Sequence, residues 1–179
     1  SPEFLMSMHL KHLNRLLVAG LLSLPTALPG QQSEIHRDHH VQARLVGEWT
    51  HIQPGHPYRV GLLLEHDPGW HTYWKSTATG YATSIKWDLP PGFTVSGLSW
   101  PAPELYDFQG YREYVYSGQV LLMATLTPPA EIDAESVTID FTADWLMCAD
   151  VCIPGKADGE LVLPVRKAPP EPASPWAAL

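Results

Sequence analysis

Short runs in which hydrophobic and polar residues alternate recur along the chain after residue 40. Residues 84–89 show the pattern simply, because Ile85, Trp87 and Leu89 are separated by polar residues. Such alternation predicts half-buried β-strands, and no segment after residue 40 keeps the i, i+3, i+4, i+7 apolar spacing of a helix for three turns. Eight strands are predicted, over residues 41–49, 58–64, 70–74, 84–89, 93–100, 114–126, 136–141 and 160–165.

Turn-forming residues separate these runs. The chain has 18 prolines, which are excluded from helix interiors and tolerated at turns and strand edges. Short strands with turns between them and no helical segments predict an all-β fold, an antiparallel β-sandwich. The predicted turns contain the segments 53–55, 67–69, 90–92, 127–129 and 154–155.

The N-terminal segment has the composition of an export signal. Lys11 and Arg15 precede an apolar run over residues 16–24, which is too short for a membrane span of roughly 20 residues. We therefore predict a cleaved secretory signal over 6–30; an uncleaved N-terminal anchor is the alternative. Residues 1–5 are typical of a vector remnant.

The remaining sequence predicts one domain between two less regular ends. The polar segment 31–40 is expected to be a flexible leader, and 41–167 is long enough to form one sandwich with a sizeable core. Residues 168–179 are rich in Pro and Ala, which is typical of a tail or semi-rigid linker.

The chain is acidic, with a formal net charge of −8 and no run of basic residues. This composition argues against nucleic acid as a partner. Export, if the signal is used, also permits cysteine oxidation.

The two cysteines of the chain, Cys148 and Cys152, are separated by three residues. In an extended strand, residues i and i+4 lie about 13 Å apart, whereas a disulfide requires Cα atoms within about 7 Å. If the pair is bonded, residues 148–152 must turn back tightly. Closing so short a loop stabilises a fold by only about 2 kcal/mol. The pair is therefore a candidate for a disulfide that opens and closes, although a structural hairpin clip remains open.

Two acidic residues, Asp144 and Asp150, are the charged neighbours of the cysteines in the sequence. A nearby carboxylate raises the pKa of a thiol and makes its thiolate scarcer. We predict that these residues tune the thiols or transfer protons to them.

The cysteine segment 142–154 (TADWLMCADVCIP) and the upstream segment 68–75 (PGWHTYWK) resemble the N-terminal periplasmic domain of the DsbD and ScsB thiol:disulfide interchange proteins. Residues 85–87 and 98–103 follow in the order expected for that family. The resemblance covers about residues 40–166, and the three-residue cysteine spacing is that of the ScsB-like branch.

The resemblance implies an immunoglobulin-like sandwich whose cysteines, Cys148 and Cys152, are redox-active without a cofactor. It implies a periplasmic domain that takes electrons from a thioredoxin-like or transmembrane donor and reduces oxidised client proteins. In relatives with longer spacing the second cysteine attacks, which favours Cys152 here.

The family also has a cap loop whose aromatic residue covers the cysteines. The segment 106–111 matches it, with Phe108 at the cap position and Tyr111 beside it. A bulky aromatic residue on a loop hinged at a glycine would limit access to a reducible disulfide. Ordinary packing of Phe108 and Tyr111 is the alternative.

Two other functions remain open from the sequence. One is a non-catalytic binding module with a static disulfide. The other is a periplasmic copper- or zinc-binding protein, because His36, His39 and His40 cluster in the leader and imidazole binds both metals. The leading interpretation, the redox domain, includes no metal site.

Overall fold

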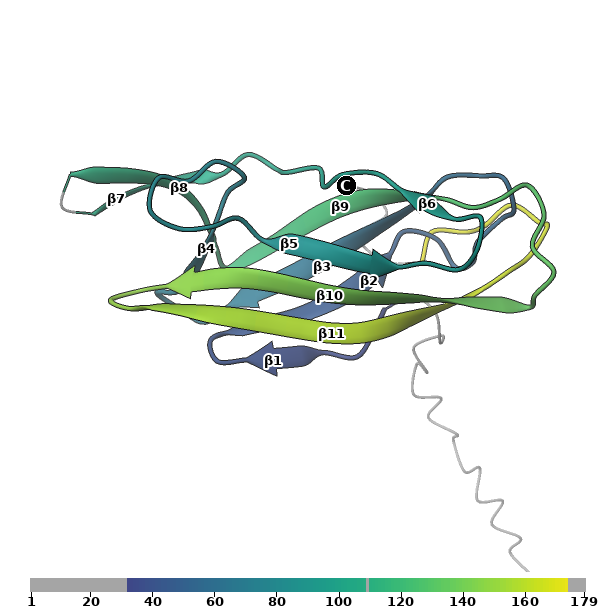
Figure 1. Cartoon of the computed structure of the whole chain (residues 1–179), viewed down its shortest axis with the longest axis horizontal. Coiled ribbons are helices and arrows are strands. Elements are labelled where there is room, and N and C mark those ends of the chain that lie inside the picture. The colour runs from purple at the N-terminus through teal and green to yellow at the C-terminus, as the bar shows by residue number, and fades with distance from the viewer. Residues whose placement is uncertain (1–31, 109, 174–179) are drawn as a thin grey trace, which may run out of the picture.

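The computed structural model describes residues 32–108 and 110–173, and all regular elements in these residues are β-strands (Figure 1). They form two sheets in which each strand pairs antiparallel with its neighbours, which confirms the predicted all-β sandwich. The strands are β1 (His36–Asp38), β2 (Val41–Gly47), β3 (Tyr58–His66), β4 (His71–Tyr73), β5 (Ser84–Asp88), β6 (Thr94–Val95), β7 (Glu104–Phe108), β8 (Tyr111–Ser117), β9 (Gln119–Thr127), β10 (Ser136–Cys148) and β11 (Cys152–Pro164).

The first sheet has the strand order β1-β2-β3-β9-β6, and the second has the order β11-β10-β4-β8-β7. One edge of β10 is paired with β11 along its whole length. Its other edge is shared by β5 and, nearer the C-terminal end of β10, by β4. The last residues of β10 therefore lie between β4 and β11 (Figure 1).

The core lies between the two sheets and follows from the alternation of the strands. In β10 every second side chain from Val137 to Met147 is buried, and Trp145 is fully enclosed. Strands β3 and β9 supply the facing side chains, such as Leu62 and Leu122. Each such side chain contributes roughly 2 kcal/mol when it is removed from water, so the core holds the sheets together without the disulfide.

Several predicted strands differ in extent from the strands of the structure. The single strand predicted over 114–126 is two strands, β8 and β9, because Gly118 adopts a positive φ of 60° and reverses the chain. The strands predicted over 136–141 and 160–165 are parts of β10 and β11, each 13 residues long. Alternation continues through both cysteine-proximal halves, and in β11 Pro154, Gly155 and Gly159 obscured it in the sequence.

The segment predicted as a flexible leader, 31–40, is instead part of the sandwich over the residues that the structure describes. Strand β1 pairs with β2, with His36 opposite Ala43. Upstream, the backbone of Ser33 bonds to the carbonyl of Leu45. The polar composition reflects an edge strand with one side facing solvent.

The first half of the predicted tail also packs on the domain. The backbone N–H of Thr50 donates to the carbonyl of Glu171, and that of Ala173 donates to Glu48. The His51 ring donates to the Ala168 carbonyl at 2.8 Å. The predicted vector remnant, the export signal and residues 174–179 lie outside the described residues.

A row of carboxylates crosses the solvent side of the second sheet. Asp140 of β10 is directly opposite Asp88 of β5 on one side and Glu160 of β11 on the other. All three residues are exposed. Like charges directly opposite each other destabilise a sheet.

Replacing the central carboxylate should therefore stabilise the domain. We expect Asp140→Lys to raise the free energy of unfolding by about 0.5–1 kcal/mol, measured by urea titration at low salt. The gain should shrink at high ionic strength, because exposed charges are screened. The control is Asp158→Lys on β11, whose cross-strand neighbour is Thr142. An equal gain in both variants would contradict the pairwise explanation.

Candidate functional site

The two cysteines face each other at the tip of the β10–β11 hairpin. Their Cα atoms are 4.1 Å apart and their sulfurs form a disulfide. The N–H of Ala149 donates to the carbonyl of Val151 at 3.0 Å, which closes the turn. The tight return that a Cys148–Cys152 bond would require is confirmed.

The two sulfur-bearing residues differ in exposure. Cys148 is only 2% exposed and packs with Tyr73 and Val115, whereas Cys152 is exposed. The difference arises because Cys148 lies between β4 and β11 within the sheet, whereas Cys152 begins β11, the edge strand. Cys152 is therefore the more accessible of the two cysteines to another protein.

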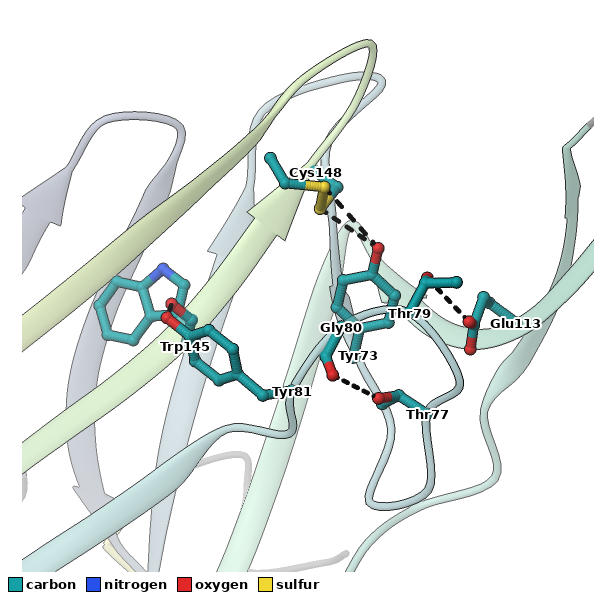
Figure 2. The surroundings of a disulfide bond; sticks show 9 residues. Tyr73, Thr77, Thr79, Gly80, Tyr81, Glu113, Trp145 and Cys148 are labelled. Atoms are coloured by element: carbon teal, nitrogen blue, oxygen red, sulfur yellow. Dashed lines mark hydrogen bonds between the residues drawn. A yellow bond between two sulfur atoms is a disulfide. The ribbon is translucent and has the colours of Figure 1, made fainter.

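Tyr73 of β4 lies beside both sulfurs. Its hydroxyl donates to Cys148 Sγ at 3.2 Å and lies 3.9 Å from Cys152 Sγ (Figure 2). Burial raises the pKa of Tyr73, so the hydroxyl keeps its proton and remains a donor. A thiolate accepts such a bond more strongly than a disulfide sulfur does. Tyr73 belongs to the PGWHTYWK segment, but nothing in the sequence alone predicted a role for it.

A loop over residues 77–81 holds the Tyr73 ring in place. Gly80 lies on the ring so closely that a Cβ there would be 2.6 Å from it. Thr77 Oγ1 donates to the Gly80 carbonyl at 2.7 Å, and Thr79 Oγ1 donates to Glu113 at 2.8 Å (Figure 2). Glu113, buried on β8, thus anchors the loop that positions the tyrosine.

His71, two residues before Tyr73, is the register partner of Cys148 on β4. Its ring lies 4.6 Å from that of Tyr106 and 5.5 Å from that of Tyr73. Only 5% of the residue is exposed, and this burial lowers the pKa of the imidazole. His71 belongs to the same PGWHTYWK segment, but the sequence alone did not place it at the cysteines.

The predicted cap segment, 106–111, forms the end of the β7–β8 hairpin. Phe108 and Tyr111 are register partners, and Gly110 has a positive φ of 85° in the turn. Tyr111 is 69% exposed and lines, with both cysteines, a hollow of about 240 Å³. The structure gives the position of Phe108 in β7, and its gating role stays a prediction.

The two predicted thiol-tuning carboxylates lie in different places. Asp150 belongs to the turn between the cysteines and lines the same hollow. Asp144 is four residues before Cys148 on the solvent side of β10, opposite Lys156, and does not line this hollow. Its charge acts instead on Tyr81, whose pKa is raised by burial and then by Asp144. Only Asp150 is brought next to the sulfurs.

Two of the three histidines of the metal-binding alternative, His39 and His40, are held by separate side-chain contacts. His39 bonds to Asp38, and the ring of His40 stacks on Trp70 at 3.9 Å. Among residues 32–108 and 110–173, no three His, Cys, Asp or Glu side chains gather closely enough to hold a metal ion. The same residues contain no helix of a length and apolarity that would cross a membrane.

The fold and the disulfide at its hairpin tip define an immunoglobulin-like sandwich of the thiol–disulfide exchange class. The family model "Thiol:disulfide interchange protein DsbD, N-terminal" matches residues 42–164. The chain therefore belongs to the DsbD N-terminal domain family, as predicted, and is a thiol:disulfide interchange domain. No curated protein matches the chain in a sequence comparison.

Solved structures of this family are among its structural neighbours. The N-terminal periplasmic domain of ScsB from Proteus mirabilis aligns with a TM-score of 0.56 and 23% identity, over 75% of this chain and 51% of that chain. The reduced DsbD N-terminal domain of Neisseria meningitidis aligns with a TM-score of 0.36 and 18% identity, over 67% and 84%. The chain thus spans about half the length of the ScsB structure.

Proposed function

We propose that this domain relays electrons in the periplasm, from a thioredoxin-like or transmembrane donor to oxidised client proteins, through Cys148 and Cys152. The observation that carries the proposal is the asymmetry of the pair, with one exposed and one buried cysteine at the tip of the hairpin. An exposed sulfur accepts attack, while its buried neighbour is protected from side reactions and remains in position to resolve.

The domain is reduced in two exchange steps. A donor thiolate attacks Cys152 Sγ, the bond to Cys148 breaks, and Cys148 leaves as a thiolate that accepts the hydrogen bond of Tyr73. The second donor thiol then attacks its partner sulfur in the mixed disulfide and releases Cys152. The donor is oxidised to a disulfide, and the pair has gained two electrons.

The client is reduced by the reverse sequence. The Cys152 thiolate attacks a client disulfide, and one client sulfur leaves. Cys148 then attacks Cys152 Sγ, the Cys148–Cys152 bond forms again, and the second client sulfur is released. Both steps need the two sulfurs to remain close, and the paired strands on each side hold them there.

Access to the pair is controlled, in this proposal, by the end of the β7–β8 hairpin. Phe108 and Tyr111 limit approach to Cys152 until a partner displaces them, and the positive φ of Gly110 supports a turn that can act as the hinge. Asp150 tunes the thiols from inside the hollow, and Asp144 has only a long-range influence.

A redox titration of the parent protein tests the proposal against a structural clip. We expect a reduction potential above about −300 mV and full reduction by a reduced thioredoxin-like protein, because exposed disulfides are the labile ones. The pair should be quantified by thiol alkylation and mass spectrometry at each glutathione ratio. A bond that resists both the glutathione buffer and the thioredoxin-like donor would establish the static clip instead.

A further inference from the structure

Cys148 is only 2% exposed, whereas Cys152 is exposed. Compared with the thiol of Cys152, the thiol of Cys148 therefore transfers its proton to water less readily. In the proposed relay this thiol becomes a thiolate each time it resolves a mixed disulfide. A thiolate forms readily only where a base accepts its proton or donors stabilise its charge. Tyr73 supplies a hydrogen bond, but its raised pKa keeps the hydroxyl protonated, so Tyr73 does not take the proton of the thiol.

His71 is placed to accept that proton. It is directly opposite Cys148 in the β4–β10 ladder, so the two side chains are on the same face of the sheet and their Cβ atoms are about 5 Å apart. Both residues line the hollow that also contains Cys152. The imidazole is confined between the rings of Tyr73 and Tyr106, which limits its orientation.

We propose that His71 is the general base and acid of the relay, taking the proton from the Cys148 thiol during resolution and returning it during reduction. The inference rests on the proposed function, since it assigns a role within that exchange cycle. When a client is reduced, Cys148 Sγ loses its proton to a ring nitrogen of His71 and bonds to Cys152 Sγ. The bond between Cys152 and the client breaks, and the client sulfur leaves as a thiolate that is protonated by the imidazolium or water.

The surroundings of His71 suit a base near neutral pH. Burial lowers its pKa, while the carboxylates of Glu104 on β7 and Glu113 on β8 act in the opposite direction. His66 on β3 is a further titratable neighbour, and its own pKa is lowered chiefly by burial. The lowered pKa favours the neutral imidazole, which can accept a proton, and the two carboxylates stabilise the imidazolium that forms.

Single-turnover exchange with one equivalent of dithiobis(nitrobenzoate) separates the two steps. The reduced domain should release one coloured thiolate when Cys152 attacks and a second when Cys148 resolves. In the parent, the second phase should be nearly independent of pH above the pKa of His71. We expect His71→Gln to slow the second phase about 100-fold at neutral pH and to leave the first phase unchanged. In His71→Gln the rate of the second phase should then rise about tenfold per pH unit, because the thiolate of Cys148 forms only by loss of its proton to water or hydroxide.

The matched control is His51→Gln, which alters another histidine that is 5% exposed but contacts Ala168 instead of the cysteines. It should retain the parent's rates in both phases. Because a substitution beside the core affects folding, His71→Ala is measured with and without added imidazole, which should restore the second phase. Failure of imidazole to restore it, or a parent-like pH profile in His71→Gln, overturns the role of His71. A parent that never releases the second thiolate overturns the relay itself, and with it any role for His71.

Discussion

A Cys148→Ser/Cys152→Ser variant should lose all measurable disulfide reduction and still fold. The loss is complete because both electrons travel through this pair. The fold survives because closing a five-residue loop contributes only about 2 kcal/mol, whereas β10 and β11 pair along 13 residues each and bury one face in the core. The measurement is client-thiol release coupled to a reduced donor, with the unfolding midpoint recorded on the same sample.

The single variants make the same prediction more specific. Cys148→Ser leaves the exposed sulfur without its resolving partner, so a mixed disulfide through Cys152 should accumulate and be visible by mass spectrometry. Cys152→Ser keeps only the buried Cys148, which should form little mixed disulfide. Equal trapping by both variants would show that Cys148 is accessible, and full activity of the double variant would end the redox assignment.

Gly155→Ala is expected to be the most damaging conservative change in the hairpin. Gly155 is opposite Trp145, and an added Cβ would lie 2.3 Å from Trp145 Nε1 and 2.7 Å from Met147 Cε. Both neighbours are fully enclosed, so neither can move without disturbing the core. Such overpacking costs about 2–3 kcal/mol, which a denaturant titration followed by circular dichroism would measure.

The control for this change is Gly97→Ala. An added Cβ at Gly97 meets no atom within 4 Å, so that variant should equal the parent or gain up to about 1 kcal/mol from the restricted unfolded chain. If Gly155→Ala is as stable as the parent, the close contact with Trp145 does not limit the fold. Since Met147 directly precedes Cys148, we also expect slower exchange in Gly155→Ala.

Much of the site was accessible from the sequence because it depends on local spacing. The distance between Cys148 and Cys152 along the chain required a tight return, and the alternation in the flanking segments predicted strands on either side. The PGWHTYWK segment was singled out, and it forms the strand that lies against the cysteines. Asp144 and Asp150, both within four residues of Cys148, were not distinguished, because sequence distance does not show which carboxylate the folded chain places beside the sulfurs.

Other features depended on chain segments whose conformation is set by their neighbours. Residues 32–40 and 168–173 are polar or proline-rich, so nothing local predicts a strand or a fixed path. They are ordered by backbone hydrogen bonds to β2 and to residues 48–51. Edge positions of this kind tolerate polar sequences because only one side of the backbone is paired.

The amino-acid sequence by itself determined that this protein is a β-sandwich with a two-cysteine turn near its C-terminal end, since alternation, turn residues and cysteine spacing are local properties. Only the tertiary structure decided that Cys148 is buried and Cys152 exposed. It also decided that Tyr73 bonds to Cys148 Sγ and that His71 lies opposite Cys148, although both residues are 75 or more positions upstream. The reason is that alternation sets the face on which a side chain lies, whereas the choice and register of the neighbouring strand depend on packing of the whole sandwich.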